Sequence, residues 1–77
     1  MPTDYPLIAR YRAAYKRLGP SFRRDVLYVM RELGIAHVDC AHALGYHGHT
    51  ATVRALRTYQ PDPERVTHVV NTVREVD

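Results

Sequence analysis

The residue types at positions 47–50 are suited to recognising nucleic acid. His47, Gly48, His49 and Thr50 stand at the start of a predicted helix, directly after a tight turn. Imidazole and hydroxyl groups donate hydrogen bonds to phosphate oxygens and to acceptors on base edges. Gly48 has no side chain to hold the helix away from another surface. This is how a helix-turn-helix presents the tip of its recognition helix to the major groove.

Arginines add positive charge to this region. Arg54 and Arg57 lie three residues apart, on the side of the predicted helix that faces away from the core. Arg23 and Arg24 begin an earlier helix, where positive charge opposes the helix dipole, which hints at an anionic partner. A solvated surface or an ordinary cap is the alternative interpretation for each residue. The residues predicted to contact DNA are Arg23, Arg24, His47, Gly48, His49, Thr50, Thr52, Arg54 and Arg57.

A cluster of imidazoles and one thiol raises the question of metal binding. Within thirteen residues the chain carries His37, Cys40, His42, His47 and His49. Histidine and cysteine at such density can bind zinc, but this spacing matches no common structural site. We therefore predict neither a metal nor a cofactor.

The chain offers little for catalysis. Cys40 beside a histidine could form a nucleophile pair, but a lone cysteine in a short helix is more often a small buried apolar residue. None of the 8 acidic residues pairs with a histidine at a spacing that suggests acid–base catalysis. We predict that no residue is catalytic and that the protein is not an enzyme.

Helices must position these residues. Apolar residues recur three and four positions apart, which predicts an all-α fold of four or five short helices and no strands. The predicted helices run from about residue 6 to 18, 22 to 33, 38 to 44, 49 to 59 and 63 to 76. The third and fourth of them form the helix-turn-helix.

Local signals mark the helix ends. Thr3 or Asp4 can cap the first helix, Ser21 the second and Asp62, which precedes a proline, the fifth. Gly45 suits the left-handed position that ends the third. The residues predicted to face the core are Leu7, Tyr11, Ala14, Tyr15, Leu18, Phe22, Val26, Val29, Met30, Leu33, Ala41, Leu44, Val53, Leu56, Tyr59, Val66, Val69, Val70 and Val73.

Length and charge agree with a small DNA-binding protein. The 77 residues are predicted to form one domain, with 45% apolar residues and a net charge of +3. Seven bases stand against three acids through Leu33, whereas two bases stand against four acids after Gln60. The N-terminal half is therefore the side predicted to face phosphate.

Several features favour a cytoplasmic protein. A single cysteine allows no internal disulfide, so nothing requires an oxidising compartment. No apolar run approaches the ~18 residues of a membrane span, and the N-terminus lacks the apolar region of a signal peptide. We expect no contact with a membrane.

The segment around the predicted turn resembles the C-terminal DNA-binding domain of the bacterial replication initiator DnaA, which has a TrpR-like fold. That family carries a signature close to Asp-His-Thr-Thr-Val-x-His-Ala, and the run at 48–55 aligns with it without a gap, matching at His49, Thr50 and Ala55. Residues 43–45 are similar to the family's Ala-Phe-Gly, and residues 31–33 to its Lys-Glu-Leu. The resemblance covers about residues 21–59.

The resemblance implies a helix-turn-helix that reads a short duplex site. It assigns His49 and Thr50 to the major groove and Arg23 to the basic segment that reaches the minor groove. Gly48 replaces the signature aspartate and Ala51 replaces a threonine, so we expect a base preference different from that of the initiator. No ATPase domain accompanies the motif here, which indicates a stand-alone small protein.

Two classes of function remain open at this point. The first is a protein that binds double-stranded DNA and regulates transcription or replication of a phage or mobile element. The second is a small helical phage protein that binds and modulates a host polymerase, nuclease or replication factor. Tyrosine is enriched at protein interfaces, and the chain has six, at Tyr5, Tyr11, Tyr15, Tyr28, Tyr46 and Tyr59.

The histidine spacing predicts that chelators leave the protein unchanged. Treatment with a strong chelator should not shift the melting temperature, because no metal contributes to folding. Metal analysis of protein purified without added zinc is the companion measurement. Stoichiometric zinc, or a drop of several degrees on chelation, would contradict the prediction.

Overall fold

The fold is all-helical, as predicted. The structure is a computed structural model that describes residues 4–76, and no strand occurs within that range. None of the helices there has the length and apolar composition needed to cross a membrane. The elements are α1 (Tyr5–Leu18), the 3₁₀ helix η1 (Pro20–Phe22), α2 (Arg23–Glu32), α3 (His37–Leu44), α4 (His49–Arg57) and α5 (Pro63–Glu75).

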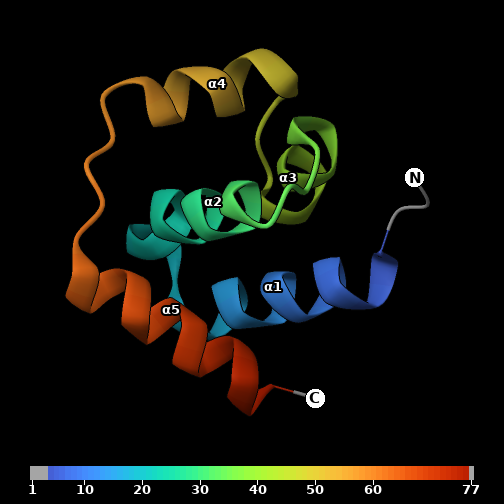
Figure 1. The fold of residues 1–77 in the computed structure, drawn as a ribbon. Helices are drawn as coiled ribbons and strands as arrows, with labels where there is room; N and C mark the ends of the chain where they lie inside the picture. Colours follow the sequence, from blue (N-terminus) through green and yellow to red (C-terminus); the bar gives the residue numbers. More distant parts are fainter. Residues whose placement is uncertain (1–3, 77) are drawn as a thin grey trace.

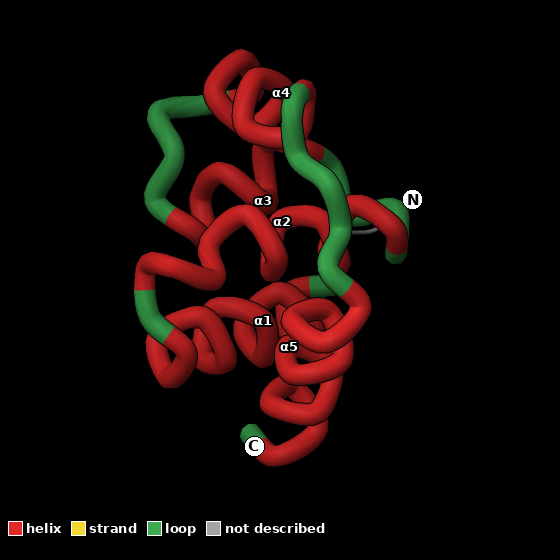
Figure 2. Tube along the Cα trace, turned by 90° about the vertical axis from the view of Figure 1, so that its left-hand side faces the viewer, coloured by secondary structure: helices red, strands yellow, loops and turns green. Residues whose placement is uncertain are grey.

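The helices are arranged so that α4 forms one end of the molecule. Figures 1 and 2 show α1 and α5 side by side at the opposite end, with α2 and α3 between them and α4. Of the described helices, α4 packs on α2 and α3. Its outer side is therefore left uncovered by the rest of the described chain.

The core lies between α1, α2, α3 and α5. Its largest fully buried apolar side chains are Leu27, Met30 and Val26 from α2, Leu44 from α3 and Val69 from α5. Leu27 was missing from the predicted set because it lies beside the main stripe of α2. A central helix that is surrounded by other helices also buries residues on either side of its main apolar stripe.

Two predicted caps are confirmed. The Asp4 carboxylate accepts a 3.1 Å hydrogen bond from the Leu7 N–H, and the Asp62 carboxylate accepts one of 2.9 Å from the Glu64 N–H. Each bond satisfies an N–H group that has no partner within its own helix. Thr3, the alternative cap of α1, lies outside the described residues.

The prediction that Ser21 caps α2 is wrong. Pro20 starts η1, so Ser21 lies inside that 3₁₀ helix, and Phe22 takes the N-cap position of α2 without a side-chain bond. The Ser21 carbonyl instead accepts a 2.6 Å hydrogen bond from the Arg65 guanidinium. The 3₁₀ helix therefore takes the place of a side-chain cap, and its Ser21 carbonyl bonds to a distant helix.

The predicted burial of Leu33 is also wrong, since this side chain is 54% exposed. Leu33 is the C-cap of α2 and keeps a helical backbone, with its N–H bonded to the Val29 carbonyl at 3.2 Å, so its exposure reflects its place at the end of the helix. The chain turns, and the Ile35 N–H donates to the Met30 carbonyl at 3.1 Å. That turn carries Ile35 into the core in place of Leu33.

A buried carboxylate joins three parts of the chain. Asp25 in the first turn of α2 is 4% exposed and accepts a 2.7 Å bond from the Tyr59 hydroxyl and a 3.1 Å bond from Arg65 Nε. The Arg65 guanidinium also lies 3.9 Å from the centre of the Phe22 ring. Burial, followed by the hydrogen bond to Asp25, raises the pKa of Tyr59, so the phenol stays protonated to a higher pH than an ordinary tyrosine does.

Replacing Asp25 with alanine should lower the free energy of unfolding by about 2–3 kcal/mol. The substitution leaves the Tyr59 hydroxyl and the Arg65 guanidinium without their charged acceptor, which is more costly than losing a solvated contact. Urea denaturation followed by circular dichroism measures the effect. The matched control is Glu32→Ala, an exposed acid on the same helix, which should change stability by no more than about 0.5 kcal/mol. Equal effects of the two substitutions would contradict this role of Asp25.

Candidate nucleic-acid interface

Two glycines shape the turn between α3 and α4. Gly45 is left-handed, with φ 76° and ψ 26°, and the Tyr46 N–H donates to the Ala41 carbonyl at 3.0 Å. This confirms the predicted helix end, because a left-handed residue at that position lets the last carbonyls find donors. Gly48 takes φ 133° at the N-cap of α4. Both backbone conformations favour glycine.

The rotation of α4 about its axis differs from the prediction. Thr52 is fully buried and Val53 is 37% exposed, so the inward side consists of Thr52, Ala55 and Leu56 rather than Val53 and Leu56. The spacing 52, 55 and 56 is as helical as the predicted one, but its first member is the hydroxyl residue Thr52. Burial of Thr52 corrects the prediction that its side chain contacts DNA.

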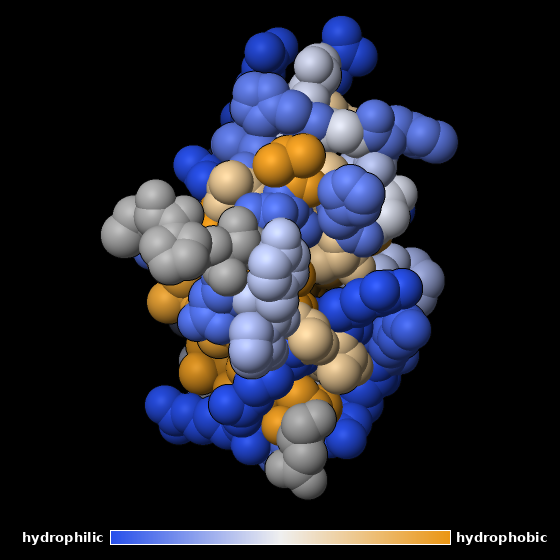
Figure 3. Space-filling model, turned by 90° about the vertical axis from the view of Figure 1, so that its right-hand side faces the viewer, coloured by the Kyte–Doolittle hydropathy of each residue, from blue (hydrophilic) through white to orange (hydrophobic). Residues whose placement is uncertain are grey.

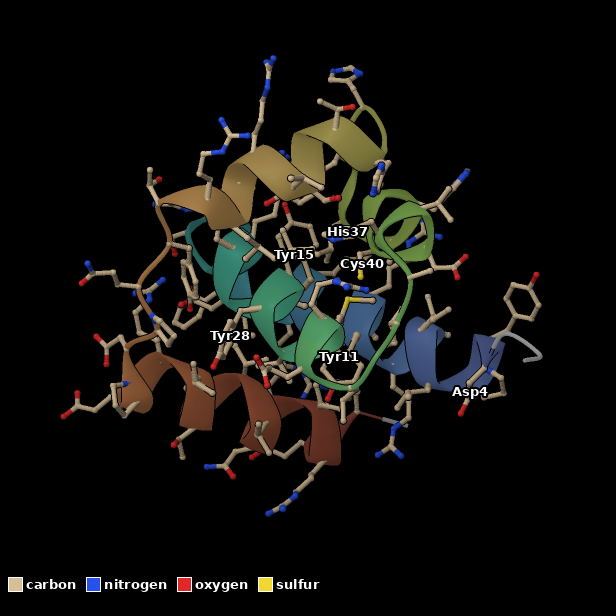
Figure 4. The ribbon with its side chains drawn as sticks, turned by 45° about the horizontal axis from the view of Figure 1, so that its top comes forward. Asp4, Tyr11, Tyr15, Tyr28, His37 and Cys40 are labelled. Carbon is tan, nitrogen blue, oxygen red and sulfur yellow. The ribbon has the colours of Figure 1, made fainter. Side chains whose placement is uncertain are left out.

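Thr52 can be buried because its hydroxyl has two hydrogen-bond partners within the protein. It donates a 2.8 Å hydrogen bond to the His49 carbonyl and lies 2.8 Å from Nδ1 of His37. Figure 4 shows His37 at the start of α3, where that helix meets α4. The His37 and His49 rings also meet edge to face, with centroids 4.9 Å apart. A polar contact between α3 and α4 therefore replaces the apolar one that the sequence suggested.

The other predicted residues of this segment are accessible. His47, His49, Thr50, Arg54 and Arg57 are exposed, and Gly48 is half-buried. The end of the molecule that α4 forms is largely hydrophilic (Figure 3). No acidic residue occurs in the sequence between positions 39 and 62. The surface around α4 therefore has positive or titratable groups with no acidic neighbour in sequence.

Arg23 and Arg24 lie against opposite flanks of this segment. The Arg23 guanidinium is 3.8 Å from the centre of the Tyr46 ring, in the turn before α4. The Arg24 guanidinium is 5.9 Å from the centre of the Tyr59 ring, after α4. Stacking of a cation on an aromatic face stabilises both positions. The structure thus brings the basic start of α2 to the two ends of α4, with Arg24 exposed and Arg23 half-buried.

His37 contacts two residues of this segment, although it is not among the residues predicted to contact DNA. Fifteen residues separate it from Thr52, and no local pattern links the two positions. Burial, then the charges of Arg31 and His49, lower its pKa. A neutral imidazole is therefore favoured at this helix junction.

The geometry favours neither a reactive Cys40 thiol nor a metal site among the nearby histidines. Cys40 is fully buried, its thiol donates to the Ile35 carbonyl at 3.7 Å, and burial raises its pKa to about 11. A thiol with that pKa is a poor nucleophile at neutral pH. Within residues 4–76, no group of three or more histidine, cysteine or acidic side chains is gathered for a metal.

Comparison with known proteins adds no relative. Neither a protein-family model, nor a curated protein, nor a solved structure matches this chain. The resemblance to the initiator domain therefore stays an interpretation of the motif at 48–55.

Replacing Gly48 with alanine should lower the free energy of unfolding by about 1–2 kcal/mol. A Cβ at this position would meet no atom within 4 Å, so crowding is not the cause. The cost comes from holding an L-residue at φ 133°, a backbone region that such residues rarely adopt. Thermal or urea denaturation measures the difference.

The control for that substitution is Thr50→Ala, two residues further along the exposed start of α4. It should change stability by no more than about 0.5 kcal/mol, because it removes no described contact and alanine is the better helix former. An unchanged stability of Gly48→Ala would show that the turn does not depend on glycine.

Proposed function

We propose that this protein binds double-stranded DNA through α4 and acts as a small regulator of transcription or replication of a phage or mobile element. The observation that carries the proposal is the exposed, acid-free outer side of α4, which forms one end of the molecule and begins at a tight glycine turn. A helix of nine residues presented in this way suits a major groove about 12 Å wide.

The start of α4 is suited to phosphate. Gly48 at the N-cap has no side chain, so the first N–H groups of the helix receive no side-chain cap from it. Free N–H groups and the positive end of the helix dipole attract anions. His49 and Thr50 are exposed beside them and add donors for a phosphate or a base edge.

Positive charge supports the same surface. Neither Arg54 nor Arg57 takes part in a hydrogen bond or ion pair with the described residues. By contrast, Arg65 pairs with Asp25, and Arg31 donates to the Ile35 carbonyl at 2.7 Å. The two arginines of α4 therefore remain available for phosphate contacts, which position a protein on duplex.

A protein partner is the second candidate function. Exposed apolar side chains favour it, since Tyr5 is 71% exposed and Val38 is 53% exposed. Apolar groups of this size at a surface can contribute to an interface with a host polymerase, nuclease or replication factor. Duplex titration together with retention of a host protein from lysate discriminates between the two candidates.

Neutralising the arginines of α4 should weaken binding to all duplexes alike. Fluorescence anisotropy of a labelled random duplex, at about 50 and about 200 mM salt, should show wild-type affinity falling with salt by a slope of about −0.9 per phosphate contacted. The double variant Arg54→Gln/Arg57→Gln should flatten that slope by about one for each arginine that contacts phosphate. Arg74→Gln, an exposed arginine on α5, is the control and should bind as the wild type does.

Base reading is tested on duplexes selected from a random pool. His49→Ala or Thr50→Ala should cost about 1–3 kcal/mol on a preferred site and little on random duplex, if the contact is to a base. A wild-type protein that binds no duplex at low salt ends the DNA-binding proposal. Specific retention of a host protein from lysate in the same experiment would then favour the second candidate.

A further inference from the structure

We propose that His37 is a positioning residue for the tip of α4, acting on His49 through Thr52. The inference rests on the proposed function, because that tip is the part of α4 assigned to DNA. His37 opens α3 and His49 opens α4, so one contact joins the starts of two helices. The ring of His37 meets that of His49 edge to face, and its Nδ1 lies 2.8 Å from Thr52 Oγ1.

The hydrogen bonds identify where the proton of His37 resides. Thr52 has one hydroxyl proton, and it is donated to the His49 carbonyl, which can only accept. Thr52 Oγ1 can then only accept a further hydrogen bond. The proton of the contact must therefore be on Nδ1 of His37. A neutral His37 is therefore the Nδ1–H tautomer. Thr52 then links the side chain of His37 to the backbone of the first residue of α4.

Positive groups surround this imidazole. Arg31 of α2 and His49 of α4 both act on it, and burial adds to their effect. His37 also stands at the positive end of the α3 dipole, close to that of α4, and a cation is unfavourable there. Because the pKa of folded His37 is lowered, its stabilising contribution is complete above the ordinary histidine pKa of about 6.5. Protonation adds a proton at Nε2 and leaves the Nδ1–H donor in place, so the contribution is lost as the pH falls below that range because burial and the charges of Arg31 and His49 disfavour the cation.

The tautomer and the order of the α4 tip can be measured without DNA. Nitrogen-15 NMR of the imidazoles should report Nδ1–H for His37 near pH 7.5. Amide hydrogen exchange at residues 52–54, which begin with the first hydrogen-bonded amide of α4 at Thr52, should be faster in His37→Ala and near wild-type in His37→Asn, whose side-chain amide can donate to Thr52. Protection in the wild type should weaken below about pH 6.5, whereas His37→Asn should show no such pH dependence beyond that of intrinsic exchange. The control is His42→Ala, an exposed histidine of the same helix.

Duplex affinity supplies the second measurement, under conditions in which every variant is folded. His37→Ala should bind about tenfold more weakly, because a disordered tip must be ordered on binding, and His37→Asn should restore most of the affinity. If the wild type binds duplex and His37→Ala binds equally tightly, the positioning role is wrong and the proposed function stands. If no duplex binds, the proposed function fails, and the tautomer and exchange data alone decide the role of His37. An Nε2–H tautomer, or unchanged exchange in His37→Ala, overturns it.

Discussion

The buried carboxylate of Asp25 is the interaction on which the position of α4 depends most. It receives hydrogen bonds from Tyr59, which follows α4, and from Arg65, which lies in α5. The segment between these helices has no regular structure of its own, so these bonds fix where it crosses α2. A buried charge with two donors tolerates few other arrangements, because any of them would leave the charge unpaired. Asp25 therefore defines the far end of α4.

The near end of α4 is fixed by a second polar contact, between His37 and Thr52. Apolar burial alone would specify this helix weakly, since its inward residues Thr52, Ala55 and Leu56 offer little large apolar surface. Hydrogen bonds are directional and so select one rotation of the helix from several of similar apolar burial. This explains why Thr52 faces inward while Val53 stays at the rim.

Features that depend on near neighbours could be predicted from the sequence, whereas those that depend on distant partners could not. The Asp4 and Asp62 caps and the left-handed Gly45 follow from residues within one or two turns. The misassigned cap at Ser21 and the inward turn of Thr52 involve contacts across 44 and 15 residues. The site residues on α4 could be chosen by type and spacing, but the role of His37 required the packing of α3 against α4.

The described arginines differ in whether the folded protein gives them a hydrogen-bond or ion-pair partner. Arg65 and Arg31 are held by the Asp25 carboxylate and the Ile35 carbonyl, and each stabilises the fold locally. Arg54 and Arg57 stand on a segment without acidic residues and have no such partner among residues 4–76. Unpaired like charges on one helix repel each other and lower stability slightly. An anion bound along α4 would remove that repulsion, so the same charges that weaken the free protein would strengthen a complex with a polyanion.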